Sequence, residues 1–140
     1  MTVLVTDRGF GVDDWAGREI LPFETLAAGG DLPADGLAID FPNDRDPAEL
    51  APWFGRLALV RIAFPSFTDG RGFSVATRLR GLGYGGRLRA RGYVIADQYT
   101  ALRRSGFDEV EIPEDLARRQ PETSWKLHDR PDYRARIARA

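Results

Sequence analysis

The chain of 140 residues has no cysteine, one lysine and one histidine, and these absences narrow its chemistry. Without cysteine it cannot form a disulfide, a thiolate metal site or an iron–sulfur cluster, and it has no thiol nucleophile. His128 lies in the charged C-terminal region, where a surface role is a better interpretation than a catalytic base. No segment is apolar and long enough to predict a signal peptide or a membrane span, so we expect a cytoplasmic protein without membrane contact.

The chain also lacks a large net charge, since its formal net charge is -1. A near-neutral chain has no general attraction to nucleic acid, and we expect none to bind. The apolar fraction of 43% is typical of a globular protein with one core. Arginine supplies all basic residues except Lys126. The planar guanidinium suits carboxylate, phosphate and sulfur oxyanions, although most arginines only keep a surface hydrated.

Short apolar runs alternate with helical patterns four times between residues 37 and 119. The expected strands are Leu37–Ile39, Leu57–Phe64, Arg87–Arg91 and Phe107–Ile112. Helices are expected from Pro47 to Gly55, Phe73 to Leu82, Tyr93 to Arg104 and Glu114 to Arg119. This alternation predicts an α/β fold with a four-stranded, mostly parallel sheet, in either a small open or a half-barrel-like arrangement.

The remaining segments predict the domain organisation. Residues 1–15 alternate around a turn and predict an N-terminal hairpin, with Asp13 and Asp14 as surface charges. Residues 16–36 are rich in glycine and proline and predict a connector with at most short structure. We expect one domain over residues 1–120 and a charged tail over residues 121–140, which is either a packed helix or a frayed end.

Polar residues follow the expected strands where parallel strands would gather their carboxyl ends. The sharpest of these loops reads SFTDGRG and ends where a helix begins, an arrangement that favours an anion. The expected ligand-binding residues are Ser66, Thr68, Asp69, Gly70, Arg71, Gly72, Arg89 and Arg91. Sulfite, sulfate or a phosphate group would suit them, whereas the structural alternative is that Asp69 or Thr68 caps the helix.

No catalytic set is complete in the sequence. Asp40 and Asp69 are the candidate catalytic residues, because carboxylates on neighbouring loops could act as acid and base. Ser66 and Ser74 have no histidine nearby in the pattern that could activate them. No dinucleotide, flavin or Walker fingerprint is present, so we expect no cofactor and no metal site.

The stretch from Phe64 to Ile112 and the early Asp-Asp-Trp resemble a known family. Its marks are FTDGRGFS, then GYGGRLRARG, then DQ followed by RSGFD, and together they resemble the bacterial domain-of-unknown-function family 934. Genes of that family typically neighbour those of assimilatory sulfite reductase and phosphoadenylylsulfate reductase, and members are labelled oxidoreductases of sulfite reduction. The resemblance implies a role in sulfate assimilation and cysteine synthesis, and it brings no catalytic residues.

Three functions are open at this point. The first is an accessory protein of sulfite reduction that binds an oxyanion or docks on sulfite reductase. The second is a small independent (βα) enzyme that acts on a phosphorylated or acidic metabolite through Asp40, Asp69 and Arg71. The third is a scaffold that forms a homo-oligomer through Trp125 and Tyr133 of the tail. Convergence of the three polar residues on a closed pocket would favour the enzyme, and a flat edge with an exposed aromatic side chain would favour docking.

Overall fold

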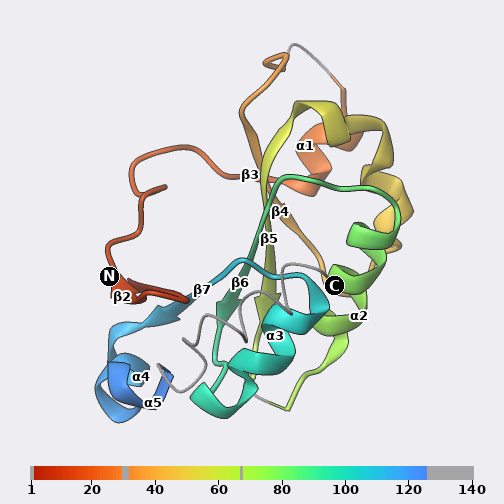
Figure 1. Cartoon of the computed structure of the whole chain (residues 1–140). Coiled ribbons are helices and arrows are strands. Elements are labelled where there is room, and N and C mark those ends of the chain that lie inside the picture. The colour runs from red at the N-terminus through yellow and green to blue at the C-terminus, as the bar shows by residue number, and fades with distance from the viewer. Residues whose placement is uncertain (1, 30–31, 67, 126–140) are drawn as a thin grey trace.

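The computed structural model describes residues 2–29, 32–66 and 68–125, which form an α/β fold around one sheet of seven strands (Figure 1). In chain order the strands are β1 (Thr2–Thr6), β2 (Gly9–Gly11), β3 (Leu21–Pro22), β4 (Leu37–Phe41), β5 (Leu57–Phe64), β6 (Arg87–Gly92) and β7 (Glu109–Pro113). Their order across the sheet is β2-β1-β7-β6-β5-β4-β3. Strands β3 to β7 are parallel, and β1 pairs antiparallel with both β2 and β7.

The helices follow the strands of the parallel part. They are α1 (Phe23–Ala27), the 3₁₀ helix η1 (Pro47–Arg56), α2 (Arg71–Gly81), the 3₁₀ turn η2 (Ala96–Gln98), α3 (Tyr99–Ser105), α4 (Glu114–Arg119) and α5 (Glu122–Trp125). Asp46 caps η1 by accepting a hydrogen bond from the Ala48 N–H, and Pro47 occupies its first turn. Gly106, with φ of 116°, ends α3 in the left-handed conformation.

All four expected strands are present, but the expectation of a four-stranded sheet is wrong. The N-terminal hairpin joins the sheet by pairing β1 with β7, with Val3 opposite Ile112. A further parallel strand, β3, lies in the segment expected to be a connector. The structure therefore has one open, mostly parallel sheet whose edges are β2 and β3.

Because consecutive parallel strands are neighbours, the sheet is wound in one direction and its helices collect on one face. Figure 1 shows α1, α2 and α3 on the same side of the strands. Alternate strand residues such as Ile39, Val60, Leu88 and Val110 are completely buried in the core on this face. The period of two along each strand places the intervening residues on the opposite face.

The opposite face, called the open face below, is crossed by residues 12–20, the crossing segment. This segment connects β2 with β3, which form the two opposite edges of the sheet. Trp15 is buried against Ala38 and Leu59, and the Arg18 guanidinium lies 3.7 Å from the centroid of its ring. The expectation of surface charges is confirmed for Asp14, whose side chain is 58% exposed, and is wrong for Asp13, whose side chain is 17% exposed; both pair with Arg89 of the open face.

The last described residues pack against the beginning of the chain. Trp125 of α5 is buried, and its ring lies 6.4 Å from Phe10 and 6.0 Å from Tyr99 between centroids. Glu122 accepts a hydrogen bond of 2.8 Å from the Phe10 N–H. The rest of the expected tail, residues 126–140 with Tyr133 and His128, lies outside the described residues.

Candidate functional site

The carboxyl ends of β3 to β7 meet at one edge of the sheet, which we call the carboxyl rim. Here the loops after β4 and β5 are joined by Asn43. Its side-chain amide donates to the Ala63 carbonyl at 3.2 Å and to the Asp69 carboxylate at 3.4 Å. The expected meeting of the first and second loops at one rim is therefore present.

Arg71 and Asp69 form an ion pair with two side-chain hydrogen bonds at the start of α2. The Arg71 Nε and Nη2 donate to the two carboxylate oxygens of Asp69 at 3.0 and 2.8 Å. Asp69 also accepts the Arg71 backbone N–H at 3.2 Å, which closes a turn around Gly70 just before α2. Because Arg71 stabilises the ionised carboxylate, the pKa of Asp69 falls to about 2. The pair is therefore ionised throughout the physiological pH range.

The other residues of the SFTDGRG loop have separate roles in the structure. The Ser66 and Thr68 hydroxyl oxygens lie 3.0 Å apart and share a hydrogen bond. Gly70 is the N-cap residue of α2 and is exposed. A Cβ at Gly72 would overlap the Phe64 ring, so this glycine permits the close packing of α2 on β5.

Arg89 lies on the open face and is fully buried. Its guanidinium pairs with four carboxylates, those of Glu109 and Glu111 of β7 and those of Asp13 and Asp14 of the crossing segment. Burial alone would lower the pKa of Arg89, but the hydrogen bonds that it donates to Glu109 and Asp13 raise it above its ordinary value. Arg89 therefore stays charged, with its donors directed at carboxylates of the same chain.

Arg91 lies two residues closer to the carboxyl rim on the same face of β6. Its side chain is 53% exposed, and its Nε lies 3.5 Å from Glu111. Gly92 follows at the end of β6 with φ of 127°, where a Cβ would overlap the Phe64 carbonyl oxygen. Arg91 is the expected ligand residue that the structure leaves accessible on this strand.

The candidate catalytic carboxylates, Asp40 and Asp69, have different partners. Asp40 accepts bonds of 2.6 and 2.8 Å from Arg61, whose Nη1 also contacts Glu111. Asp69 is bound by Arg71 and Asn43, so the two carboxylates share no hydrogen-bond partner. Asp40, Asp69 and Arg71 thus form two separate ion-pair groups.

Two surfaces of the carboxyl rim are hollowed. The first, the arginine hollow, has a volume of about 500 Å³ between the start of η1 and the start of α2. Its polar lining comes from Asn43, Arg45, Asp46, Arg71, Ser74 and Arg78. Of these, only Arg71 was among the expected ligand residues, although the spacing of Arg45 and Glu49 by four residues is a readable signal of a fixed guanidinium.

The second surface, the tyrosine rim, surrounds Tyr93 on the loop after β6. Tyr93 is 48% exposed and separates hollows of about 430 and 290 Å³. Pro65 lines both hollows, Ser66 and Arg119 line the larger, and Arg91 lines the smaller. Tyr93 was expected inside a helix, but the helical structure begins only at Ala96, and the loop presents the ring to solvent.

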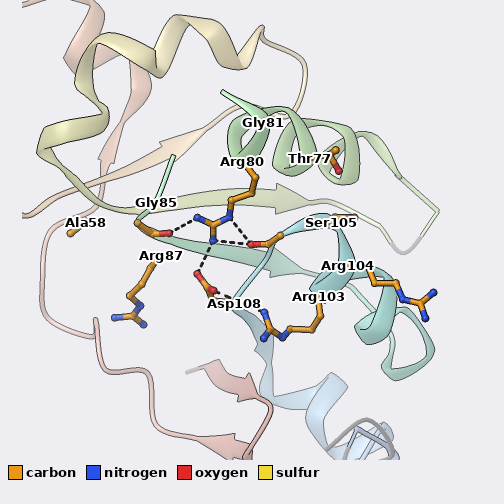
Figure 2. Close-up of a pocket in the computed structure, with 12 residues that line it drawn as sticks. Ala58, Thr77, Arg80, Gly81, Gly85, Arg87, Arg103, Arg104, Ser105 and Asp108 are labelled. Atoms are coloured by element: carbon orange, nitrogen blue, oxygen red, sulfur yellow. Dashed lines mark hydrogen bonds and ion pairs between the residues drawn. The ribbon is translucent and has the colours of Figure 1, made fainter. Parts of the chain in front are cut away.

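A larger hollow of about 1000 Å³ lies at the opposite, amino edge of the sheet. Figure 2 shows Arg80 at its centre, with Arg104 directed away from Arg80. The Arg80 guanidinium donates to the carbonyls of Tyr84, Gly86 and Gly106 and to Asp108. The Arg80 side chain therefore ties together the loops before β6 and β7.

A metal site and a membrane span are two features that the sequence does not predict. No group of three or more histidine, cysteine, aspartate or glutamate side chains within residues 2–29, 32–66 and 68–125 could hold a metal ion. None of the helices in that part of the chain is long and apolar enough to cross a membrane.

Fold and rim together define a class: an α/β protein with a singly wound parallel sheet and a polar, arginine-bearing carboxyl rim. The chain belongs to the family described as "Bacterial protein of unknown function (DUF934)", whose sequence profile matches residues 38–137. Neither the curated proteins nor the solved structures contain a match to the chain.

Proposed function

We propose that this protein is an accessory protein of assimilatory sulfite reduction, in cysteine biosynthesis, that docks on sulfite reductase. The sulfur pathway comes from what the family resemblance implies. The docking surface in this proposal is the tyrosine rim, and the arginine hollow is the place for an oxyanion. In this proposal the protein binds to the reductase and catalyses no redox step itself.

One observation carries the docking part, namely the exposure of Tyr93 on the carboxyl rim. Only Val12, Leu82 and Tyr93 are large apolar side chains with high exposure among the described residues. A tyrosine combines apolar area with a hydroxyl group, which is why tyrosine is enriched at protein interfaces. Arg91 and Arg119, whose side chains are 53% and 66% exposed, add charge on the two sides of this ring.

The separation of the candidate catalytic groups also supports docking over an independent enzyme. An acid–base pair must reach one substrate from two sides, so both carboxylates must face the same space. Asp40 and Asp69 instead neutralise different arginines, Arg61 and Arg71. An exposed ring next to separated ion pairs is the combination that we expect of a binding surface.

A pull-down with purified sulfite reductase tests the docking. We expect the wild-type protein to retain the reductase and Tyr93→Ser to lose most of it, because the exposed ring would supply the central contact. Leu82→Ser is the matched control, since Leu82 is also exposed, at 39%, but ends α2 at the amino edge. Equal retention by wild type and Tyr93→Ser, or no retention by either, would contradict the proposal.

A gene deletion tests the pathway. We expect the deletion strain to grow poorly on sulfate or sulfite and normally on sulfide, which enters after the reductase step. Complementation with the wild-type gene should restore growth on sulfite, and the Tyr93→Ser gene should not. Normal growth of the deletion strain on all three sulfur sources would remove the accessory role.

A further inference from the structure

The arginine hollow is built by the two loops that follow neighbouring parallel strands. Phe41 of β4 pairs with Ile62 of β5, so the loops leave the sheet side by side. Asn43 of the first loop is bonded to Ala63 and Asp69 beside the second loop. This cross-link fixes the two walls of the hollow relative to each other, as a preformed ligand site requires.

Two guanidinium groups on these walls are held by one edge only. Arg45 gives its Nε and Nη2 to Glu49 at 2.9 Å each, and Arg71 gives the same two nitrogens to Asp69. An arginine has about five N–H donors, so each pair uses about two of them. Residues 2–29, 32–66 and 68–125 provide no hydrogen-bond partner for the Nη1 group of either side chain.

These carboxylate pairs orient the two arginines. A guanidinium fixed along its Nε–Nη2 edge presents its Nη1 donors in a defined direction and loses less side-chain entropy when it binds a ligand. The carboxylates also remove part of the positive field, so a bound oxyanion would be selected more by geometry than by net charge. We therefore expect modest affinity in the isolated protein.

Arg78 and Ser74 supply further side-chain donors that have no close partner in the described part of the chain. The Arg78 side chain is 58% exposed, and its nearest acid is Asp46 of the hollow at 4.0 Å, which is a long contact. Ser74, one turn before Arg78 on α2, is exposed, and its hydroxyl group has no partner in the described part of the chain. Both residues line the hollow together with Arg45 and Arg71.

We infer that the arginine hollow binds the phosphate or sulfate group of a small organic molecule, through Arg45, Arg71, Arg78 and the Ser74 hydroxyl. Arginine forks and a hydroxyl donor match the oxygens of a tetrahedral oxyanion. The volume of about 500 Å³ lies within the range of small-molecule sites, about 300–1,000 Å³, and leaves room for an organic part beside Val75 and Pro47. The inference rests on the oxyanion part of the proposed function, but not on the docking.

Calorimetric titration of the full chain tests this inference with inorganic sulfate, inorganic phosphate and ribose 5-phosphate. We expect ribose 5-phosphate to bind with a Kd of about 1 mM or tighter. Arg78→Gln should weaken this binding about tenfold or more, because it removes a charged donor, and Ser74→Ala should weaken it a few-fold. Both residues are exposed, so the variants should keep the fold.

Arg118→Gln is the matched control, because Arg118 is an exposed arginine of α4 and lines neither the arginine hollow nor the hollows of the tyrosine rim. It should leave the titration unchanged. Stronger binding of ribose 5-phosphate than of inorganic phosphate supports an ester ligand, and equal binding of the ions and the ester identifies an oxyanion site without recognition of the organic part. The inference is wrong if none of the three probes binds, or if Arg78→Gln binds as well as the wild type.

The outcome is independent of the docking experiment. The titration uses the isolated protein and residues of η1 and α2, whereas the pull-down depends on Tyr93. A positive titration with a failed pull-down would remove the docking role and keep the ligand site. The reverse result would keep the docking role and remove the ligand.

Discussion

The open face and the carboxyl rim use the same residue type in opposite ways. On the open face, Arg89 is fully buried and four carboxylates surround its guanidinium. At the rim, Arg45, Arg71 and Arg78 are 44%, 60% and 58% exposed and use few of their donors. The difference shows that unused donors, rather than the presence of arginine, separate a candidate binding site from a structural network.

We expect the removal of Arg89 to have the largest effect on stability. A small effect would contradict the comparison between the open face and the carboxyl rim. We expect Arg89→Met to lower the free energy of unfolding by about 3–5 kcal/mol, because the buried Glu109 and Glu111 would each lose a fully buried charge partner and keep only the more exposed arginines beside them. Chemical denaturation measures the loss. Arg91→Met, on the same face of β6 but 53% exposed, should change stability by about 1 kcal/mol or less. Similar losses in the two variants would contradict the assignment of Arg89 as the buried centre.

Arg80 at the amino edge should give an intermediate effect. Arg80→Leu removes the donors for the Tyr84, Gly86 and Gly106 carbonyls, and we expect a loss of about 2–3 kcal/mol. Thermal and denaturant unfolding should agree on this value. Arg78→Leu on the same helix has only a long ion pair to lose and should cost about 0.5 kcal/mol or less. If both variants were equally stable, the amino-edge hollow would be as open to ligand binding as the rim.

Arg71 should give the smallest change in stability and a clear change in titration. Arg71→Gln should change the free energy of unfolding only slightly, because the Arg71 side chain is 60% exposed. The pKa of Asp69 should rise from about 2 toward its ordinary value of 3.8, since its main stabilising partner is gone.

The sign of the pH effect follows from that lowered pKa. An aspartate with a lower pKa in the folded state stabilises the fold above its unfolded pKa, and this contribution disappears as the pH falls through the folded value. In the wild type the pair should therefore be lost between about pH 4 and pH 2. Carboxyl carbon NMR of Asp69 measures this titration, and Arg45→Gln is the control that should not move it. An unchanged Asp69 midpoint in Arg71→Gln would contradict the pairing.

Local sequence patterns were sufficient for the parallel part of the sheet. The buried run of β5 and the alternation of Leu88 and Ala90 with arginines predict strands because only one residue in two must face the core. The short strand β3 carries no such pattern, since it has two residues and one is Pro22. Its position depends on pairing with β4, which is a property of the tertiary structure.

The candidate site was less predictable for the same reason. The partners of Arg89 lie about 20 residues later on β7 and about 75 residues earlier in the crossing segment, so no local rule could assign them. The rule that neighbouring aspartates on an extended chain diverge did not apply to Asp13 and Asp14, because both reach Arg89. One signal in the sequence could have indicated the network. Every second residue of β6 is an arginine, at 87, 89 and 91, and the next strand has Glu109 and Glu111 at the same spacing.

The pairing of β1 with β7 has a consequence for how the chain is made. Thr2 lies opposite Pro113, so β1 can pair with β7 only after the long stretch of chain between them has been synthesised. Until then β1 and β2 have only each other, and an isolated two-stranded hairpin is barely stable in water. The crossing segment pairs with Arg87 and Arg89 of β6, so it must also wait until β6 has formed. We therefore expect a slow final closure in which the N-terminus docks onto a core already formed by β4, β5 and β6.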